Sequence, residues 1–194
     1  MKLWRAFVLM WLAMTLAGCG INTIPTYDEQ VKAAWAQVQN QYQRRADLVP
    51  NLVNTVQGFA DQEREVLVDV TEARAKVGSI QAGEDILDNP EKFKQFEQAQ
   101  NQLGSALQRL MVVVERYPDL KSNQNFLALQ SQLEGTENRI AVARRDYIEA
   151  VRQYNTEIRT FPGRIWHSLL YSELEQRENF EATTENAEQA PTVN

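Results

Sequence analysis

Few side chains in this sequence could carry out catalysis. His167 is the only histidine among 194 residues and Cys19 the only cysteine, which excludes a histidine-based triad and a zinc site built from several such ligands. No glycine-rich phosphate loop, Walker motif or HExxH motif occurs. Carboxylates are abundant, but on heptad helices they mostly occupy solvated faces. The sequence therefore predicts a protein with no enzymatic activity, metal or cofactor, and His167 is interpreted as a partly exposed packing residue.

Cys19 is the one side chain with a predicted covalent chemistry. It follows Leu16-Ala17-Gly18, and this run resembles the bacterial lipobox, whose cysteine becomes the new N-terminus and carries lipid such as palmitate. Residues 1–18 combine a basic start with an apolar core that is shorter than the roughly 20 residues of a membrane-spanning helix. We therefore predict a lipoprotein signal peptide over residues 1–18 and lipidation of Cys19.

Two other interpretations of the N-terminus stay open. One is an ordinary signal peptide that happens to precede a cysteine, and the other is an uncleaved anchor whose basic end stays in the cytoplasm. In both interpretations the rest of the chain is exported. Residue 20 is Gly and not the Asp that, by analogy with lipoprotein sorting, retains a protein in the inner membrane. The periplasmic face of the outer membrane is therefore favoured in a host with two membranes, and otherwise the outer face of the cytoplasmic membrane.

The net charge argues against nucleic acid as a partner. The formal net charge is −6, and loss of residues 1–18, which contain Lys2 and Arg5 but no acid, makes it −8. Affinity for nucleic acid comes from Lys and Arg against phosphates. Anionic lipid headgroups would also repel an acidic chain. Lipid on Cys19, and not a basic patch, is therefore expected to hold the protein at a membrane.

Apolar residues recur in alternating steps of four and three along three stretches, which is typical of helices that pack like coiled coils. A tether over residues 19–26 precedes the first stretch, and Thr26 and Glu29 form a predicted capping box. The first stripe has 14 positions, 12 of them apolar: Val31, Trp35, Val38, Tyr42, Arg45, Val49, Leu52, Val56, Phe59, Glu63, Val66, Val70, Ala73 and Val77. The second runs from Phe93 to Tyr117 and the third from Phe126 to Phe161.

The stripes predict an all-α fold, an antiparallel bundle of three long helices with a short fourth helical segment at residues 164–172. Pro50 interrupts the first helix, and because the stripe keeps its register there we expect a kink. A break that uses Asp47 as a new N-cap is the alternative. Asn89 and Pro90 are expected to begin the second helix. The bundle then covers residues 27–172, and an acidic, partly disordered tail covers residues 173–194.

Several runs resemble the LemA family of bacterial membrane-associated helical proteins. The most specific is residues 44–53, Arg-Arg-Ala-Asp-Leu-Val-Pro-Asn-Leu-Val. The others are Trp35, 55–60 with Glu63, 117–121 with Phe126, 136–141, Arg144 with Tyr147, 154–155 and 161–162. The resemblance implies an α-helical bundle at a membrane and no defined activity. The chain departs from the family in having a lipoprotein signal in place of a membrane helix, and Ile148 where the family tends to have Asn.

The polar residues of these runs are the candidate interaction residues: Arg44, Arg45, Asp47, Asn51, Glu63, Glu137, Asn138 and Arg144. Arg45 and Glu63 lie inside the first stripe, and because an unpaired buried charge costs several kcal/mol, each should find a partner on a facing helix. With the third helix parallel to the first, Glu63 is expected to pair with Arg144 or Arg145. Arg45 is expected to reach Glu134 or a polar neighbour. Such layers either fix the helix register or line a polar pocket.

We therefore predict a non-catalytic, membrane-anchored envelope scaffold or adaptor that binds another envelope or membrane protein. The alternative is a binding or sensor module for a small ligand or a cell-wall fragment, which would use the polar layers of the bundle. Self-association into a homo-oligomer is compatible with both.

Overall fold

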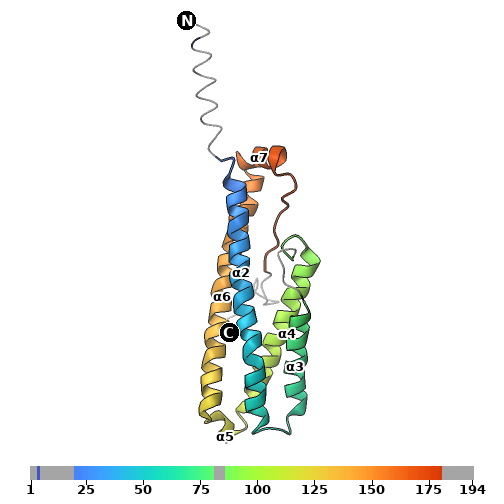
Figure 1. Ribbon diagram of the computed structural model, residues 1–194, viewed down its shortest axis with the longest axis vertical. Coiled ribbons are helices and arrows are strands. Elements are labelled where there is room, and N and C mark those ends of the chain that lie inside the picture. Colours follow the sequence, from blue (N-terminus) through green and yellow to red (C-terminus); the bar gives the residue numbers. More distant parts are fainter. Residues whose placement is uncertain (1–3, 5–19, 81–85, 181–194) are drawn as a thin grey trace, which may run out of the picture.

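The computed structural model describes residues 4, 20–80 and 86–180, so Cys19, nearly all of the predicted signal peptide and residues 181–194 lie outside it. The described helices are α2 (Thr23–Gln57), α3 (Arg64–Ser79), α4 (Pro90–Val114), α5 (Pro118–Lys121), α6 (Gln124–Arg159) and α7 (Gly163–Leu170). The described ranges contain no strand, and the predicted all-α helical bundle is confirmed (Figure 1).

Helix starts follow local capping chemistry. The Asn89 side chain accepts a hydrogen bond from the backbone N of Lys92 at 3.0 Å, and Pro90 occupies the first position of α4, as predicted. Asn123 caps α6 in the same way. The start of α2 differs from the prediction. Residues 23–26, assigned to the tether, form its first turn, and the Thr26 hydroxyl donates to the Asn22 carbonyl within the helix in place of capping it.

The prediction that the first stripe forms a single continuous helix is wrong, because the chain reverses at residues 58–63. Gly58, a poor helix former, follows the last residue of α2, and the backbone N of Ala60 still bonds to Val56 at 2.9 Å. Ala60 is then buried while Phe59, a stripe position, is 44% exposed. The helix continues through Pro50, so the chain does not break at Asp47. As a result α3 runs back along α2 and α4, and α6 runs antiparallel to α2 (Figure 1).

Two apolar clusters fill the bundle at different heights. The cluster near α7 is aromatic, with the Trp35 ring centroid 5.2–5.6 Å from those of Phe93, Phe96 and Tyr147. The cluster near α5 is mainly aliphatic and includes Leu52, Leu103, Leu107, Leu110 and Leu133. In the sequence of α2, Tyr42 belongs to the first cluster and Val49 to the second, so Arg45 falls between them.

Residues 171–180, which we call the strap, follow α7 and run along the bundle without regular secondary structure (Figure 1). Phe180 is 8% exposed and packs in the aromatic cluster, 5.0 Å from Phe93 between ring centroids. The strap therefore contacts the bundle, although residues 173–180 were predicted to belong to the acidic tail and not to the bundle. A segment without regular secondary structure has no helical periodicity, so the stripes could not reveal this contact.

Candidate functional site

Arg45 lies at the centre of a buried polar layer between the two apolar clusters. Its side chain is 4% exposed, and Nη2 donates to the backbone O of Gln100 at 2.8 Å and to its Oε1 at 2.7 Å. Nη1 donates to the Glu137 carboxylate at 3.2 and 3.3 Å. The guanidinium also lies 5.0 Å from the centroid of the Tyr42 ring. The layer thus joins α2, α4 and α6. The acidic partner of Arg45 is Glu137, a polar neighbour of the predicted Glu134 that lies about one helical turn further along α6.

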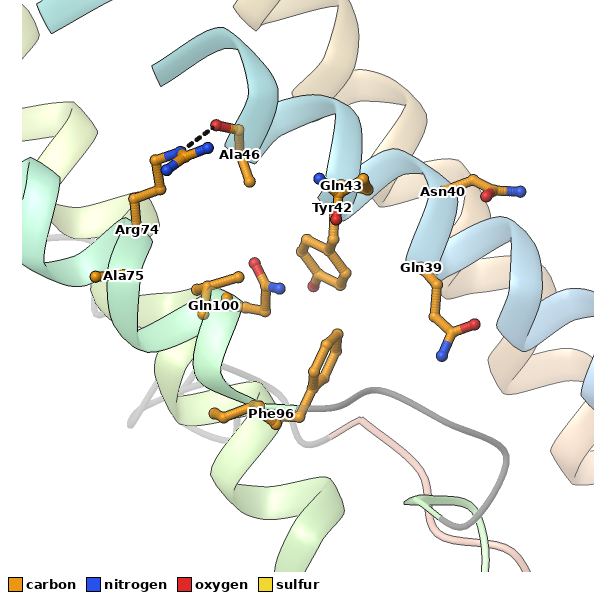
Figure 2. Close-up of a pocket in the computed structure, with 12 residues that line it drawn as sticks. Gln39, Asn40, Tyr42, Gln43, Ala46, Arg74, Ala75, Phe96 and Gln100 are labelled. Atoms are coloured by element: carbon orange, nitrogen blue, oxygen red, sulfur yellow. Dashed lines mark hydrogen bonds between the residues drawn. The ribbon is translucent and has the colours of Figure 1, made fainter. Parts of the chain in front are cut away.

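Pro50 removes the hydrogen-bond donor that the Ala46 carbonyl would have within α2, and α3 supplies a donor in its place. In an uninterrupted helix the N–H of residue 50 would bond to the carbonyl of residue 46, but proline has no N–H. The Arg74 Nε of α3 donates to the Ala46 carbonyl at 2.9 Å (Figure 2). Because Ala46 is 7% exposed, this bond provides the partner that a largely buried carbonyl requires. Sequence reasoning missed Arg74, since it placed residue 74 far from residue 46.

A cavity of about 440 Å³ lies beside this bond, between α2, α3 and α4 (Figure 2). The rings of Tyr42 and Phe96 form one wall, edge to face with centroids 5.4 Å apart. Burial raises the pKa of Tyr42, so its hydroxyl stays protonated at neutral pH. The polar lining residues are Gln39, Asn40, Gln43, Arg74 and Gln100. We call this space the amide cavity, after its four side-chain amides.

A second and larger space, the α4–α6 groove, lies on the other side of the Arg45 layer. It has a volume of about 620 Å³, and its apolar lining comes from Leu107, Met111 and Leu133. Polar residues complete it: Gln108, Gln130, Glu134, Glu137 and Asn138. Two of the predicted site residues, Glu137 and Asn138, therefore line one groove, and Glu137 connects that groove to Arg45.

The other predicted residues of the 44–53 run do not converge on a site. Arg44, Asp47 and Asn51 are exposed on α2, opposite the buried Arg45 and Val49. Asp47 accepts a hydrogen bond from Gln43 Nε2 at 2.7 Å, one turn earlier on the same helix. The run is thus divided between a core face and a solvated face.

Glu63 does not pair with Arg144 or Arg145, so that prediction is wrong. Its carboxylate accepts from Arg116 Nη2 at 3.1 Å and from the Tyr117 hydroxyl at 2.8 Å, next to the reversal at residues 58–63. Arg144 instead lies 3.4 Å from Glu97 and stacks over Phe180. The reversal is the physical reason, because it places Glu63 beside Arg116 and Tyr117 near α5, whereas Arg144 lies near the middle of α6, which runs antiparallel to α2.

The strap is held by a second polar network that the sequence did not predict. Asn155 pairs with the backbone of Arg177 in both directions, at 2.9 and 3.0 Å. The Arg177 side chain donates to Asp28 at 2.7 Å and also bonds to Asp88, and both Arg177 and Asp28 are buried. Burial would raise the pKa of Asp28, but hydrogen bonds from Arg177 and Lys32 outweigh it and hold the pKa below its usual value.

Two tyrosines and the histidine also bind the strap backbone. Tyr147 and Tyr154 each donate a hydroxyl to a strap carbonyl, of Glu178 and Glu175 respectively, both at 2.9 Å. Burial raises the pKa of both tyrosines, so both hydroxyls remain protonated donors at neutral pH. His167 Nε2 lies 2.8 Å from the Leu174 carbonyl. His167 is half-buried, as expected from the sequence, and its contact with the Leu174 carbonyl was not predicted.

Within the described ranges no three or more His, Cys, Asp and Glu side chains are grouped so that they could hold a metal ion. None of the helices that the structure describes has both the length and the apolar character needed to cross a membrane. The two spaces offer surfaces that could bind a ligand or another protein. One is the amide cavity, and the other is the α4–α6 groove, whose lining includes apolar and acidic residues.

Comparison with known proteins gives consistent matches. The model of the LemA family matches residues 34–194. Magnetosome protein MamQ 2 of Paramagnetospirillum magneticum is 29% identical over an alignment of 168 positions that covers 77% of this chain and 60% of that protein. Protein LemA of Metamycoplasma hominis is 24% identical over 140 residues, 72% of this chain and 60% of the relative. The chain thus spans about 60% of the length of these relatives.

Proposed function

Because the chain belongs to the LemA family, we propose that it is a non-catalytic adaptor of the cell envelope that binds a helix of another protein in the α4–α6 groove. Lipid on Cys19 would anchor it to a membrane after export. The observation that carries the proposal is the groove of about 620 Å³, which is lined by Leu107, Met111 and Leu133 together with polar side chains. A groove with an apolar lining is the form that accepts the apolar face of an amphipathic helix.

The charges at the groove specify the partner further. Glu134 is exposed, and the Glu137 side chain is 45% exposed although it pairs with Arg45. Among the residues that the structure describes, no Lys or Arg lines the groove. A complementary partner helix therefore carries apolar residues on one face and Lys or Arg at its border. Relatives named as magnetosome proteins are named for a cellular structure and not for a reaction, which supports an adaptor more than an enzyme.

Site-specific photocrosslinking in cells tests this function. A benzophenone side chain would replace Asn138, which lines the groove, or the neighbouring Arg139, which is also exposed but does not line it. We expect one discrete protein adduct from position 138 and little from position 139, and mass spectrometry of the adduct identifies the partner peptide. Equal adduct patterns at the two positions, or no protein adduct at 138 in cells that contain the anchored chain, would contradict the proposal.

The amide cavity favours a second candidate function, the binding of a small polar ligand such as a cell-wall fragment. Its volume of about 440 Å³ falls within the range of small-molecule sites. Side-chain amides and Arg74 could bind hydroxyl, amide or carboxylate groups. In this case a soluble muropeptide fraction would raise the unfolding temperature of the chain, and Gln39→Leu would abolish the shift. An adaptor without such a ligand shows no shift.

A further inference from the structure

Four apolar side chains in and just before α7 are left exposed by the residues that the structure describes. Phe161 is 82% exposed, Leu169 69%, Leu170 53% and Ile165 45%. Ile165 and Leu169 are spaced by four residues and therefore lie on one side of α7, and Phe161 comes just before the first turn of this helix. Arg164 and Ser168 lie on another side of the helix, and the half-buried Trp166 packs against the aromatic cluster. Water is a poor solvent for the four exposed apolar side chains, so another apolar phase should cover them.

The chain segment that leads to Cys19 lies directly against this helix. Gly20 has φ +124°, a conformation that favours glycine. A Cβ placed on Gly20 would lie 3.8 Å from Pro162 Cγ and from Trp166 Nε1. The residue before Gly20 is Cys19, so a lipid attached there would begin one residue from the α7 contact. The start of α2 and α7 share one end of the bundle (Figure 1).

The size of the face argues for lipid over a second copy of the chain. A stable dimer interface needs about 800 Å² and 20–30 residues from each partner. Helix α7 has only eight residues, and four exposed apolar side chains form the face. Such an amphipathic segment does match the interfacial zone of a bilayer, where its apolar face enters the acyl boundary. A single acyl chain binds membranes only marginally, so a second contact beside the anchor would strengthen attachment.

We propose that α7 and Phe161 lie in the interface of the membrane that holds Cys19 and form a second, non-covalent membrane contact. This proposal rests on the membrane anchor of the proposed function, and it adds the orientation of the bundle. The end with α7 faces the bilayer, and the end with α5 points away from it.

Photocrosslinking of the full chain to vesicles of phosphatidylethanolamine and phosphatidylglycerol tests the contact. A benzophenone side chain at Leu169 should form adducts with the mass of a phospholipid, while one at Ser168, exposed on another side of α7, should form few. Vesicle-bound protein without lipid adducts at 169 would overturn the α7 contact and leave the anchor standing. Protein–protein dimers from position 169 would also overturn it, because they would show a second copy on this face. Failure to float with vesicles would overturn both.

A second pair of variants separates the contribution of α7 to membrane binding from that of the lipid on Cys19. In a Cys19→Ser chain without acyl lipid, Leu169→Glu should weaken flotation with vesicles about tenfold, since burial of a leucine side chain accounts for at least that factor. Ser168→Glu adds the same charge next to it and should leave flotation unchanged. Both positions are exposed, so neither variant is expected to unfold the bundle. Equal losses in the two variants would contradict the proposal.

Discussion

Arg45 connects three helices at the height where the apolar packing is interrupted. Removing it leaves Gln100, which is 3% exposed, without its donor, and an unsatisfied buried acceptor is costly. We predict that Arg45→Met lowers the free energy of unfolding by about 3 kcal/mol. Glu137→Gln should cost about 1 kcal/mol or less, because the Glu137 side chain is 45% exposed and solvent screens its charge. Urea denaturation measures both values, and equal losses would refute a layer centred on Arg45.

Pro50 and Arg74 form a second residue-scale unit, since the proline removes a donor that the arginine replaces. We predict that Arg74→Met costs about 1–2 kcal/mol, because the Ala46 carbonyl loses its partner. In a Pro50→Ala chain the helical N–H returns, and the same Arg74→Met change should cost much less. A double-mutant cycle by urea denaturation measures this coupling. Arg44→Met, on the exposed side of α2, serves as the control and should be nearly neutral. Additive losses would show that Arg74 stabilises α3 in another way.

At the scale of elements, the strap depends on a carboxylate whose pKa is depressed. The stabilisation from Asp28 is therefore fully present above about pH 4, its usual range, and is lost as the pH falls through its lower folded-state pKa. We predict that hydrogen-exchange protection of the Arg177 amide, corrected for intrinsic rate, is constant from pH 7 to about 5 and falls below about 4.

In an Asp28→Asn chain this protection should already be reduced at pH 7, and its acid loss should be smaller. Glu149→Gln provides the matched control. Hydrogen bonds from Arg152 and Gln153 lower the pKa of Glu149 to about 2, but its carboxylate is on the exposed surface of α6, and both donors belong to α6 and not to the strap. If Asp28→Asn and Glu149→Gln behaved alike, the Asp28–Arg177 pair would not be what holds the strap.

The elements show which features of the sequence were informative. Periodicity located α4 and α6, and it identified Arg45 as a buried charge that needs a partner. It could not locate the reversal at residues 58–63, because the stripe continues across it with Phe59 and Glu63 in register. Once that turn was missed, α6 was placed parallel to α2 and Glu63 was assigned the wrong partners. Gly58 was the available signal, whereas Pro50, the stronger helix breaker, is accommodated by a bond from Arg74 that sequence alone cannot show.

At the scale of the whole molecule, the proposed anchor and the proposed partner site lie in different halves of the bundle. Gly20 and α7 occupy one end, with the aromatic cluster. The α4–α6 groove takes its apolar lining from the aliphatic cluster, toward the other end (Figure 1). An adaptor built in this way would hold its groove away from the bilayer, where another envelope protein could reach it.

Lipidation of Cys19 is the whole-molecule prediction that tests the anchor alone. Cells that express the wild-type chain should incorporate labelled palmitate into it, because Cys19 is the only cysteine and follows a lipobox-like run. Cys19→Ser should abolish the label and shift part of the protein from the membrane fraction to the soluble fraction. A Ser variant that is still labelled and still processed as a lipoprotein would refute the anchor.

A charge exchange across the α4–α6 groove tests the central claim, that a basic amphipathic helix of another protein binds there. Glu134→Lys should reduce the protein adduct formed from a benzophenone at position 138 at least tenfold, because like charges then face each other across the groove. Replacing the matching Lys or Arg of the captured protein by Glu should restore the adduct. An adduct yield that is insensitive to Glu134→Lys, or that the partner's reversed charge does not restore, would contradict the account.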